Sequence, residues 1–238
     1  TKLKKLDLSD NQLTFLPESL GELTELQSLN LSMNNLTTIP ESLAELVKLN
    51  SLDLDYNPLP RLPDKLSRLR GLTALAITGT QLMGLPDWLG ELTQLQMLEA
   101  GDAAVVRLPE SLQQLTQLRT LYLSGSKLTD LPDWFAAFVK LEGLNLSDNK
   151  LRSLPDSLGN LQQLEFLHLF HNELTVLPGS LGQLSKLRSL IVHHNELVSL
   201  PESIGQLTRL EQLDLEANQL KELPDSVGNL TRLATLDL

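Results

Sequence analysis

Hydrophobic and polar residues follow one order along the chain, and this order recurs every 23 residues. The first copy starts at Leu3 and reads LKKLDLSDNQLTFLPESLGELTE. An asparagine marks the phase of most copies, at Asn11, Asn34, Asn57, Asn149, Asn172, Asn195 and Asn218. The phase runs unbroken through the middle copies, where Thr80, Ala103 and Ser126 take this slot. A fixed period of this length is the sequence signature of a repeat architecture.

Each copy predicts two short elements. Leu6, Asp7 and Leu8 alternate between apolar and polar, which is the spacing of a strand. Pro17, Leu20 and Leu23 follow a three-residue spacing opened by a proline, which suits a short helical or 3-10 turn. Burying an apolar side chain contributes roughly 1.5–3 kcal/mol, whereas ordering one backbone residue costs roughly 1–2 kcal/mol. A copy with few apolar anchors therefore needs its neighbours, and the copies are predicted to stack as a solenoid.

The pattern L-x-x-L-x-L-x-x-N-x-L followed by LPxxLxxL resembles the leucine-rich repeat family. Ten full copies run from residue 3, residues 233–238 open an eleventh, and the departures are conservative, such as Ile77, Val105 and Val192. The 23-residue subtype is similar to Ras-suppressor-like and leucine-rich-plus-PDZ scaffolds, Roco GTPases and bacterial repeat proteins. The resemblance implies one α/β array over residues 1–238, a curved horseshoe with a parallel sheet on its concave face and short turns on its convex face. It also implies that the repeated asparagine bonds backbone groups between turns.

The composition of the chain argues against several classes of function. The chain carries 30 acidic and 19 basic residues, a net charge of −11, which argues against nucleic-acid binding. It has no cysteine, which excludes disulfides and thiol chemistry. Its longest apolar run, Trp134–Val139, is too short to span a bilayer. The missing cysteine caps, together with glycosylation sequons that fall on the predicted inner sheet, favour a cytoplasmic location. Because neither end shows a polar cap, we expect a fragment of a longer protein.

The predicted inner face is acidic. Ten acids against one base, Lys5, stand on columns that should project from the sheet: Asp7, Asp10, Asp53, Asp55, Glu99, Asp102, Asp148, Asp214, Glu216 and Asp237. This face would favour a partner protein with a basic surface. The alternative is that these acids only keep a wet sheet soluble.

One part of this face differs from the rest. Its aromatic, apolar and histidine residues are Phe166, His168, Phe170, His171, Ile191, His193 and His194. With strands about 4.8 Å apart, His171 should lie beside His194, and Phe170 beside His193. We interpret this patch as the anchor for a partner protein, because binding energy concentrates at such side chains. The alternative is cross-strand stacking that only stabilises the sheet. The predicted partner-binding set is completed by Tyr122, Asp53, Asp55, Tyr56, Asp214 and Glu216.

The sequence carries no strong catalytic or cofactor motif. His171, His194 and Asp148 are expected to converge, but they do not form a full ligand set, so no metal ligand and no cofactor are assigned. No phosphate-binding loop, nucleophile elbow or zinc-protease motif is present. We therefore expect neither an enzyme nor a small-molecule ligand. The leading hypothesis is a protein-protein interaction module. The alternative is a regulatory repeat domain within a multidomain signalling enzyme, such as a Roco-like GTPase or a bacterial effector.

Two regions depart from the repeat. Ala100 and Ala103 replace a core leucine and the asparagine of their copy, which predicts fast hydrogen exchange over residues 100–106. Trp88 and Trp134 stand on the predicted convex side. They either form an apolar patch for an interface or fold over their own turns.

Overall fold

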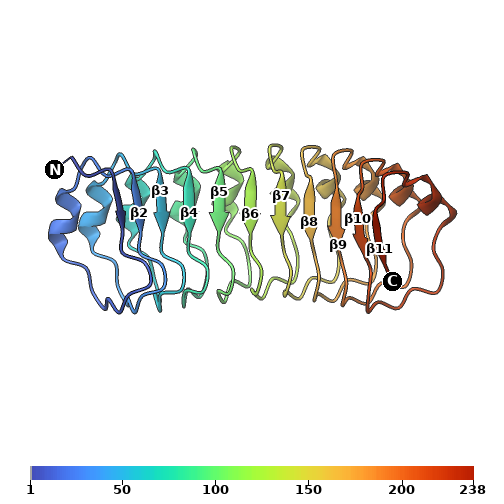
Figure 1. Ribbon diagram of the computed structural model, residues 1–238, viewed down its shortest axis with the longest axis horizontal. Coiled ribbons are helices and arrows are strands. Elements are labelled where there is room, and N and C mark those ends of the chain that lie inside the picture. The colour runs from blue at the N-terminus through green and yellow to red at the C-terminus, as the bar shows by residue number, and fades with distance from the viewer. Residues whose placement is uncertain (1) are drawn as a thin grey trace. The chain divides into compact units, whose positions relative to one another are not determined.

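The computed structural model describes residues 2–238, which form two compact units. The first unit ends at Leu118 and the second runs from Arg119 to Leu238. In each unit short strands alternate with five-residue 3-10 turns, and the described residues contain no α-helix. Within each unit, Figure 1 shows the strands lying side by side with their arrows in one direction and the turns on the other side of each coil.

The first unit contains β1 (Lys5–Asp7), η1 (Glu18–Glu22), β2 (Ser28–Asn30), η2 (Glu41–Glu45), β3 (Ser51–Asp53), η3 (Asp64–Arg68), β4 (Ala74–Ala76), η4 (Asp87–Glu91), β5 (Met97–Glu99) and η5 (Glu110–Gln114). The second contains β6 (Thr120–Tyr122), η6 (Asp133–Ala137), β7 (Gly143–Asn145), η7 (Asp156–Asn160), β8 (Phe166–His168), η8 (Gly179–Gln183), β9 (Ser189–Ile191), η9 (Glu202–Gln206), β10 (Gln212–Asp214), η10 (Asp225–Asn229) and β11 (Thr235–Asp237). Within each unit, consecutive strands pair in parallel without offset, so Leu144 of β7 lies opposite Leu167 of β8. The strand and turn predictions are confirmed, and every turn is of the 3-10 type.

The repeated leucines form the core. In the copy that begins at Leu141 they are nearly inaccessible to solvent, and they are Leu141, Leu144, Leu146, Leu151, Leu154, Leu158 and Leu161. Each turn follows a proline with extended backbone, such as Pro155, whose carbonyl accepts a bond from the N–H of Leu158 at 3.0 Å. A proline at the start of a turn is favoured because its own N–H would have no partner there.

The asparagine ladder links successive copies. The Nδ2 of Asn172 donates to the carbonyl of Leu146 at 2.9 Å in the preceding copy and to Leu169 at 3.0 Å in its own copy. Its Oδ1 accepts from the N–H of Leu151 at 2.9 Å. The side chain is 8% exposed, so these bonds are shielded from water. The role that the resemblance implied for this residue is therefore observed.

Where the asparagine is missing, some of the polar groups in its place form local bonds instead. Thr80 Oγ1 donates to the carbonyl of its own copy at Ile77, 2.9 Å away. An asparagine in place of Thr80 would accept a bond from the N–H of Leu59. Here this N–H donates to the backbone carbonyl of Asn57, two residues earlier, at 2.7 Å. The N–H of Val105 likewise donates to the backbone carbonyl of Ala103, also at 2.7 Å. These substitutions replace a link between copies by a link within one copy.

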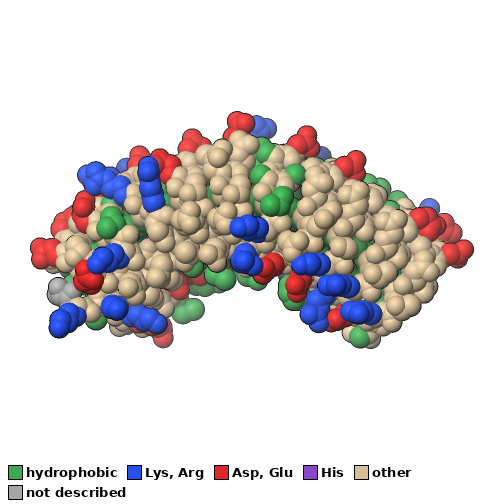
Figure 2. All heavy atoms as spheres, turned by 90° about the horizontal axis from the view of Figure 1, so that it is seen from above, with side chains coloured by type: hydrophobic (Ala, Val, Ile, Leu, Met, Phe, Trp, Pro, Cys, Tyr) green, Lys and Arg blue, Asp and Glu red, His purple; other side chains and the backbone are tan. Residues whose placement is uncertain are grey.

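Some of the ion pairs between neighbouring copies lie at the edge where the strands begin. Lys48 contacts Glu25 at 2.5 Å in the first unit, and Arg188 contacts Glu211 at 3.0 Å in the second. Figure 2 looks onto this side, where Lys and Arg side chains gather among Asp and Glu. The paired side chains are exposed, so each pair contributes only roughly 0–1 kcal/mol.

Candidate functional site

A left-handed backbone follows almost every strand. The third residue after the strand has φ between 50° and 66° at Asp10, Met33, Tyr56, Gly79, Asp102, Gly125, Asp148, His171, His194 and Ala217. Outside glycine this conformation is uncommon, and Asp, Asn and His tolerate it best. Here the turn sets the direction of the side chains that follow the strands, and it therefore shapes the site.

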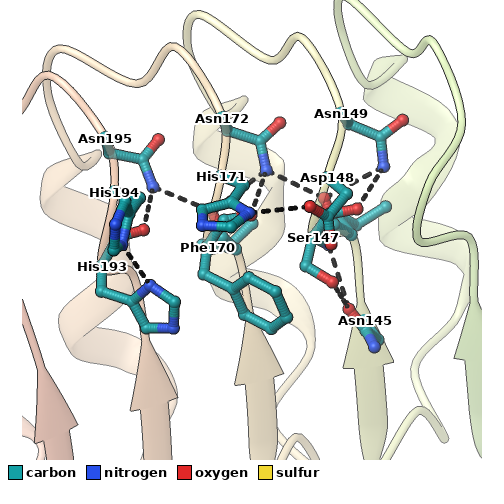
Figure 3. Close-up of polar contacts among 12 residues, drawn as sticks. Asn145, Ser147, Asp148, Asn149, Phe170, His171, Asn172, His193, His194 and Asn195 are labelled. Carbon is teal, nitrogen blue, oxygen red and sulfur yellow. Dashed lines mark hydrogen bonds and ion pairs between the residues drawn. The ribbon is translucent and has the colours of Figure 1, made fainter.

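Three imidazole rings form a histidine cluster, consisting of His171, His193 and His194. The Nδ1 atoms of His193 and His194 are 2.9 Å apart. The ring centroid of His171 lies 4.6 Å from that of His194 and 5.6 Å from that of His193. Figure 3 shows the three rings after the ends of β8 and β9, together with Asp148 from the preceding copy. His171 and His194 are therefore neighbours, as the sequence predicts.

Two further side chains position the histidine cluster. Asp148 Oδ1 lies 2.8 Å from Nδ1 of His171 and fixes one edge of that ring (Figure 3). Phe170 stacks on His193 with ring centroids 4.8 Å apart and planes inclined by 15°. This confirms the predicted contact between Phe170 and His193. Phe170 is half-buried, so it supports the cluster more than it projects into solvent.

His168 differs from the other three histidines in its position. It lies on β8 itself and is half-buried. Burial lowers the pKa of its imidazole, because the charged form loses hydration. Ile191 pairs with it in register on β9 and is only 9% exposed, so little of its predicted contact surface faces solvent.

Two exposed aromatic side chains flank a glycine and form an aromatic notch, defined by Tyr122, Gly143 and Phe166. Gly143 of β7 lies between Thr120 of β6 and Phe166 of β8 in the strand register. Phe166 is 46% exposed and Tyr122 is 38% exposed. A methyl group at Gly143 would lie 3.9 Å from the ring and hydroxyl of Tyr122, which shows that this ring leans over the glycine. Sequence reasoning named both rings but missed Gly143, whose lack of a side chain was the available signal.

Acidic side chains lie beside this surface within the second unit. Asp214 of β10 pairs in register with Ile191 of β9, and Glu216 follows on an exposed position. The backbone N–H of Glu216 donates to Asp214 Oδ1 at 3.2 Å, which fixes the direction of that carboxylate.

The other predicted acids belong to the first unit. Burial raises the pKa of Asp55 to about 7, against a bond from the Thr78 N–H and with the charges of Asp53 and Glu99 acting in the same direction as burial. Burial also raises the pKa of Glu99. Tyr56 is 50% exposed, and its ring covers Gly79 so closely that a methyl group there would lie 2.5 Å from it. Asp53, Asp55 and Tyr56 therefore form a surface of their own.

The two tryptophans are each half-buried on the turn side of their own unit. Trp134 stacks on Phe135 with centroids 6.3 Å apart and meets Phe138 edge-on at 5.9 Å. Phe135 and Phe138 are fully buried in place of the usual leucines. Trp134 therefore folds over its own turn, as one of the two sequence interpretations predicts. The Nε1 of Trp88 is buried without a hydrogen-bond partner among the described residues.

Comparison with known proteins gives one consistent family. The profile described as "Leucine rich repeat" matches residues 1–59, 116–174 and 185–238. The chain belongs to the leucine-rich repeat family. The profile is that of a repeat, and leucine-rich repeats typically carry no catalytic activity. No curated protein matched the chain.

Solved leucine-rich repeat structures share the fold. A leucine-rich repeat protein of Leptospira interrogans is 32% identical with a TM-score of 0.85, and the match covers 98% of this chain and 67% of that one. The ectodomain of the Arabidopsis thaliana receptor kinase GASSHO1/SCHENGEN3, solved with CASPARIAN STRIP INTEGRITY FACTOR 2, is 36% identical with a TM-score of 0.89, covering 98% and 29%. The Arabidopsis receptor kinase HAESA, solved with the peptide hormone IDA and the co-receptor SERK1, is 29% identical with a TM-score of 0.83, covering 100% and 46%. Within residues 2–238, no helix has the length and apolar character needed to cross a bilayer.

Proposed function

We propose that this leucine-rich repeat chain binds a partner protein or peptide on the strand face of its second unit. The aromatic notch carries the proposal. Two rings that are 46% and 38% exposed stand beside Gly143, and the ring of Tyr122 leans over this glycine. Exposed aromatic side chains are among those at which binding energy concentrates in protein interfaces.

Charge defines the kind of partner. Asp214 and Glu216 lie beyond the notch on β10 and after it, and the net charge of the chain is −11. A partner segment with an apolar side chain for the notch and Lys or Arg beside it would complement this surface. Such charges mainly speed encounter and select the partner, while the apolar contact holds it.

Two structural relatives support a peptide-like partner. The GASSHO1/SCHENGEN3 ectodomain was solved in complex with CASPARIAN STRIP INTEGRITY FACTOR 2, and the receptor kinase HAESA in complex with the peptide hormone IDA and the co-receptor SERK1. They share 36% and 29% identity with this chain and its fold over nearly all of its length. The comparison supports the class of partner and leaves its identity to experiment.

The test is selection from a displayed library of random peptides, followed by affinity measurement with synthetic copies of the enriched sequences. We expect F166A and Y122A each to weaken binding by at least about tenfold, the effect of losing a hot-spot side chain. V176A is the matched control, because Val176 is 49% exposed but lies on a loop away from the strands. Equal affinity for F166A, Y122A and the unaltered chain would refute the proposed site.

A second arm tests the charge. D214N and E216Q together should lower the association rate for basic peptides and reduce its dependence on salt. The predicted cytoplasmic location stays a prediction and does not enter this test.

A further inference from the structure

The histidine cluster has the features of a metal site. The three side chains of His171, His193 and His194 each offer a ring nitrogen, and these atoms all lie within 4.8 Å of one another. His171 and His194 are exposed and His193 is half-buried, so an ion can reach all three from solvent. The cluster combines ligands from two copies of the repeat, so the sheet register holds them together.

The sequence places His193 in one patch with His171 and His194, but it does not show that the rings of His193 and His194 meet. Residues 193 and 194 are adjacent, and adjacent side chains in an extended strand point to opposite faces. The left-handed backbone at His194, with φ of 53°, lies outside the strand and leaves its Nδ1 only 2.9 Å from that of His193. The third ligand thus comes from backbone geometry that hydrophobic spacing does not reveal.

We propose that His171, His193 and His194 bind one transition-metal ion of the Zn²⁺, Co²⁺, Ni²⁺ or Cu²⁺ class. Neutral imidazole nitrogen suits these ions, whereas Mg²⁺ and Ca²⁺ prefer oxygen ligands. Three protein ligands leave a fourth position for water or for a donor atom from another molecule. This proposal does not depend on partner binding.

Asp148 completes the arrangement as a positioning residue. Its Oδ1 lies 2.8 Å from Nδ1 of His171, which leaves Nε2 of that ring as the free ligand atom. Histidine ligands commonly donate their second ring N–H to a carboxylate in this way, which fixes the tautomer and the ring orientation. The stacking of His193 on Phe170, at 4.8 Å and 15°, restricts a second ring.

The ring positions require only a small adjustment. Zn–N bonds of about 2.0–2.1 Å in a tetrahedral site place two nitrogens about 3.3 Å apart. The three ligand nitrogens of the histidine cluster, one from each ring, all lie within 4.8 Å of one another. The Nδ1 atoms of His193 and His194 are 2.9 Å apart, which is slightly closer than in a zinc site. Rotation of the exposed side chains about their own bonds covers that difference and leaves the backbone in place.

The experiment is calorimetric titration of the full chain, without any affinity tag, with ZnSO₄ and with CoCl₂. We expect one ion bound per chain and, with Co²⁺, visible absorption typical of a site with nitrogen ligands. H193Q and H194Q combined should abolish this binding. D148N should weaken it by about 10–100-fold, the usual cost of losing a second-sphere partner.

H168Q is the matched control, since it removes the one remaining histidine, which lies on β8 rather than in the cluster. It should bind Zn²⁺ as the unaltered chain does. A measurement on the unaltered chain avoids any question of misfolding: paramagnetic Ni²⁺ should broaden the NMR signals of the three cluster rings at lower concentration than those of His168. No binding to the unaltered chain, binding retained after H193Q and H194Q, or equal broadening at His168 would each overturn the proposal. Unchanged affinity in D148N would remove Asp148 from it.

Discussion

The side chain of Asn172 accepts a hydrogen bond from the backbone N–H of Leu151, 21 residues earlier, at 2.9 Å. The same side chain donates to carbonyls of both copies that it joins. One buried amide therefore satisfies backbone groups that the loops between strand and turn would otherwise leave unpaired. The array depends on such links because a single copy buries too little apolar surface by itself.

We predict that N172A lowers the free energy of unfolding by at least about 2 kcal/mol, because buried backbone groups lose their partner. N11A is the matched control at the same slot of the first copy. Asn11 is exposed, and its side chain donates to the carbonyls of Leu8 and Ser9 in its own copy. Its replacement should cost less than about 1 kcal/mol. Chemical denaturation followed by circular dichroism measures both, and equal losses would contradict the assigned role.

Glycine within the turns allows close stacking of neighbouring turns. A methyl group at Gly205 would lie 2.4 Å from the carbonyl oxygen of Ser226 in the next turn. G205A should therefore destabilise the second unit by about 1–3 kcal/mol through overpacking. Gly228 occupies the same place in η10 and meets nothing within 4 Å. G228A should be neutral or stabilising by up to about 1 kcal/mol. The two melting temperatures, measured side by side, decide the point.

Asp55 predicts a pH dependence in the first unit. Burial raises its pKa to about 7 from 3.8. Between these values the unfolded chain loses a proton that the folded chain keeps, so the stability contributed by the protonated group is full below pH 3.8 and falls until about pH 7. We expect D55N to remove this fall, so the difference in denaturation midpoint between D55N and the unaltered chain should grow with pH across this window.

D53N provides a check on the cause. The charge of Asp53 helps to raise the pKa of Asp55, so its loss should shift the upper end of the pH window downwards. A difference between D55N and the unaltered chain that stays constant from pH 4 to pH 8 would show that the carboxyl of Asp55 ionises normally.

Hydrogen exchange should be fastest where the ladder is interrupted. Ala103 has no side-chain atom that can accept a hydrogen bond. The N–H of Val105 donates to the backbone carbonyl of Ala103 at 2.7 Å, within the same copy. We expect residues 100–106 to exchange faster than residues 169–175, where Asn172 occupies the same slot. Exchange read by mass spectrometry of overlapping peptides tests this directly, and equal protection of both segments would refute it.

The sequence predicts the regular part of the molecule well. The spacing of Leu144 and Leu146, followed by Pro155, identifies the strand, its buried side and the start of the turn, since apolar burial and proline sterics act locally. The site is predicted less completely. The neighbours of His171 and Phe170 follow from strand spacing, whereas the approach of His193 to His194 follows from a left-handed backbone. Aspartate and glycine in that slot of other copies, such as Asp148 and Gly125, were the signal that pointed to it.

The strict register of the sheet has a consequence for evolution and engineering. The copies that carry the asparagine meet their neighbours through the same bonds, as Asn195 does with the carbonyls of Leu169 and Val192. Removal of residues 187–209 would join Lys186 to Leu210 and bring equivalent surfaces together again. A deletion one residue longer or shorter would move leucines out of the interior. Gain or loss of length is therefore tolerated in steps of one whole coil, and the surface on the strands can change by exchanging coils while the interior stays the same.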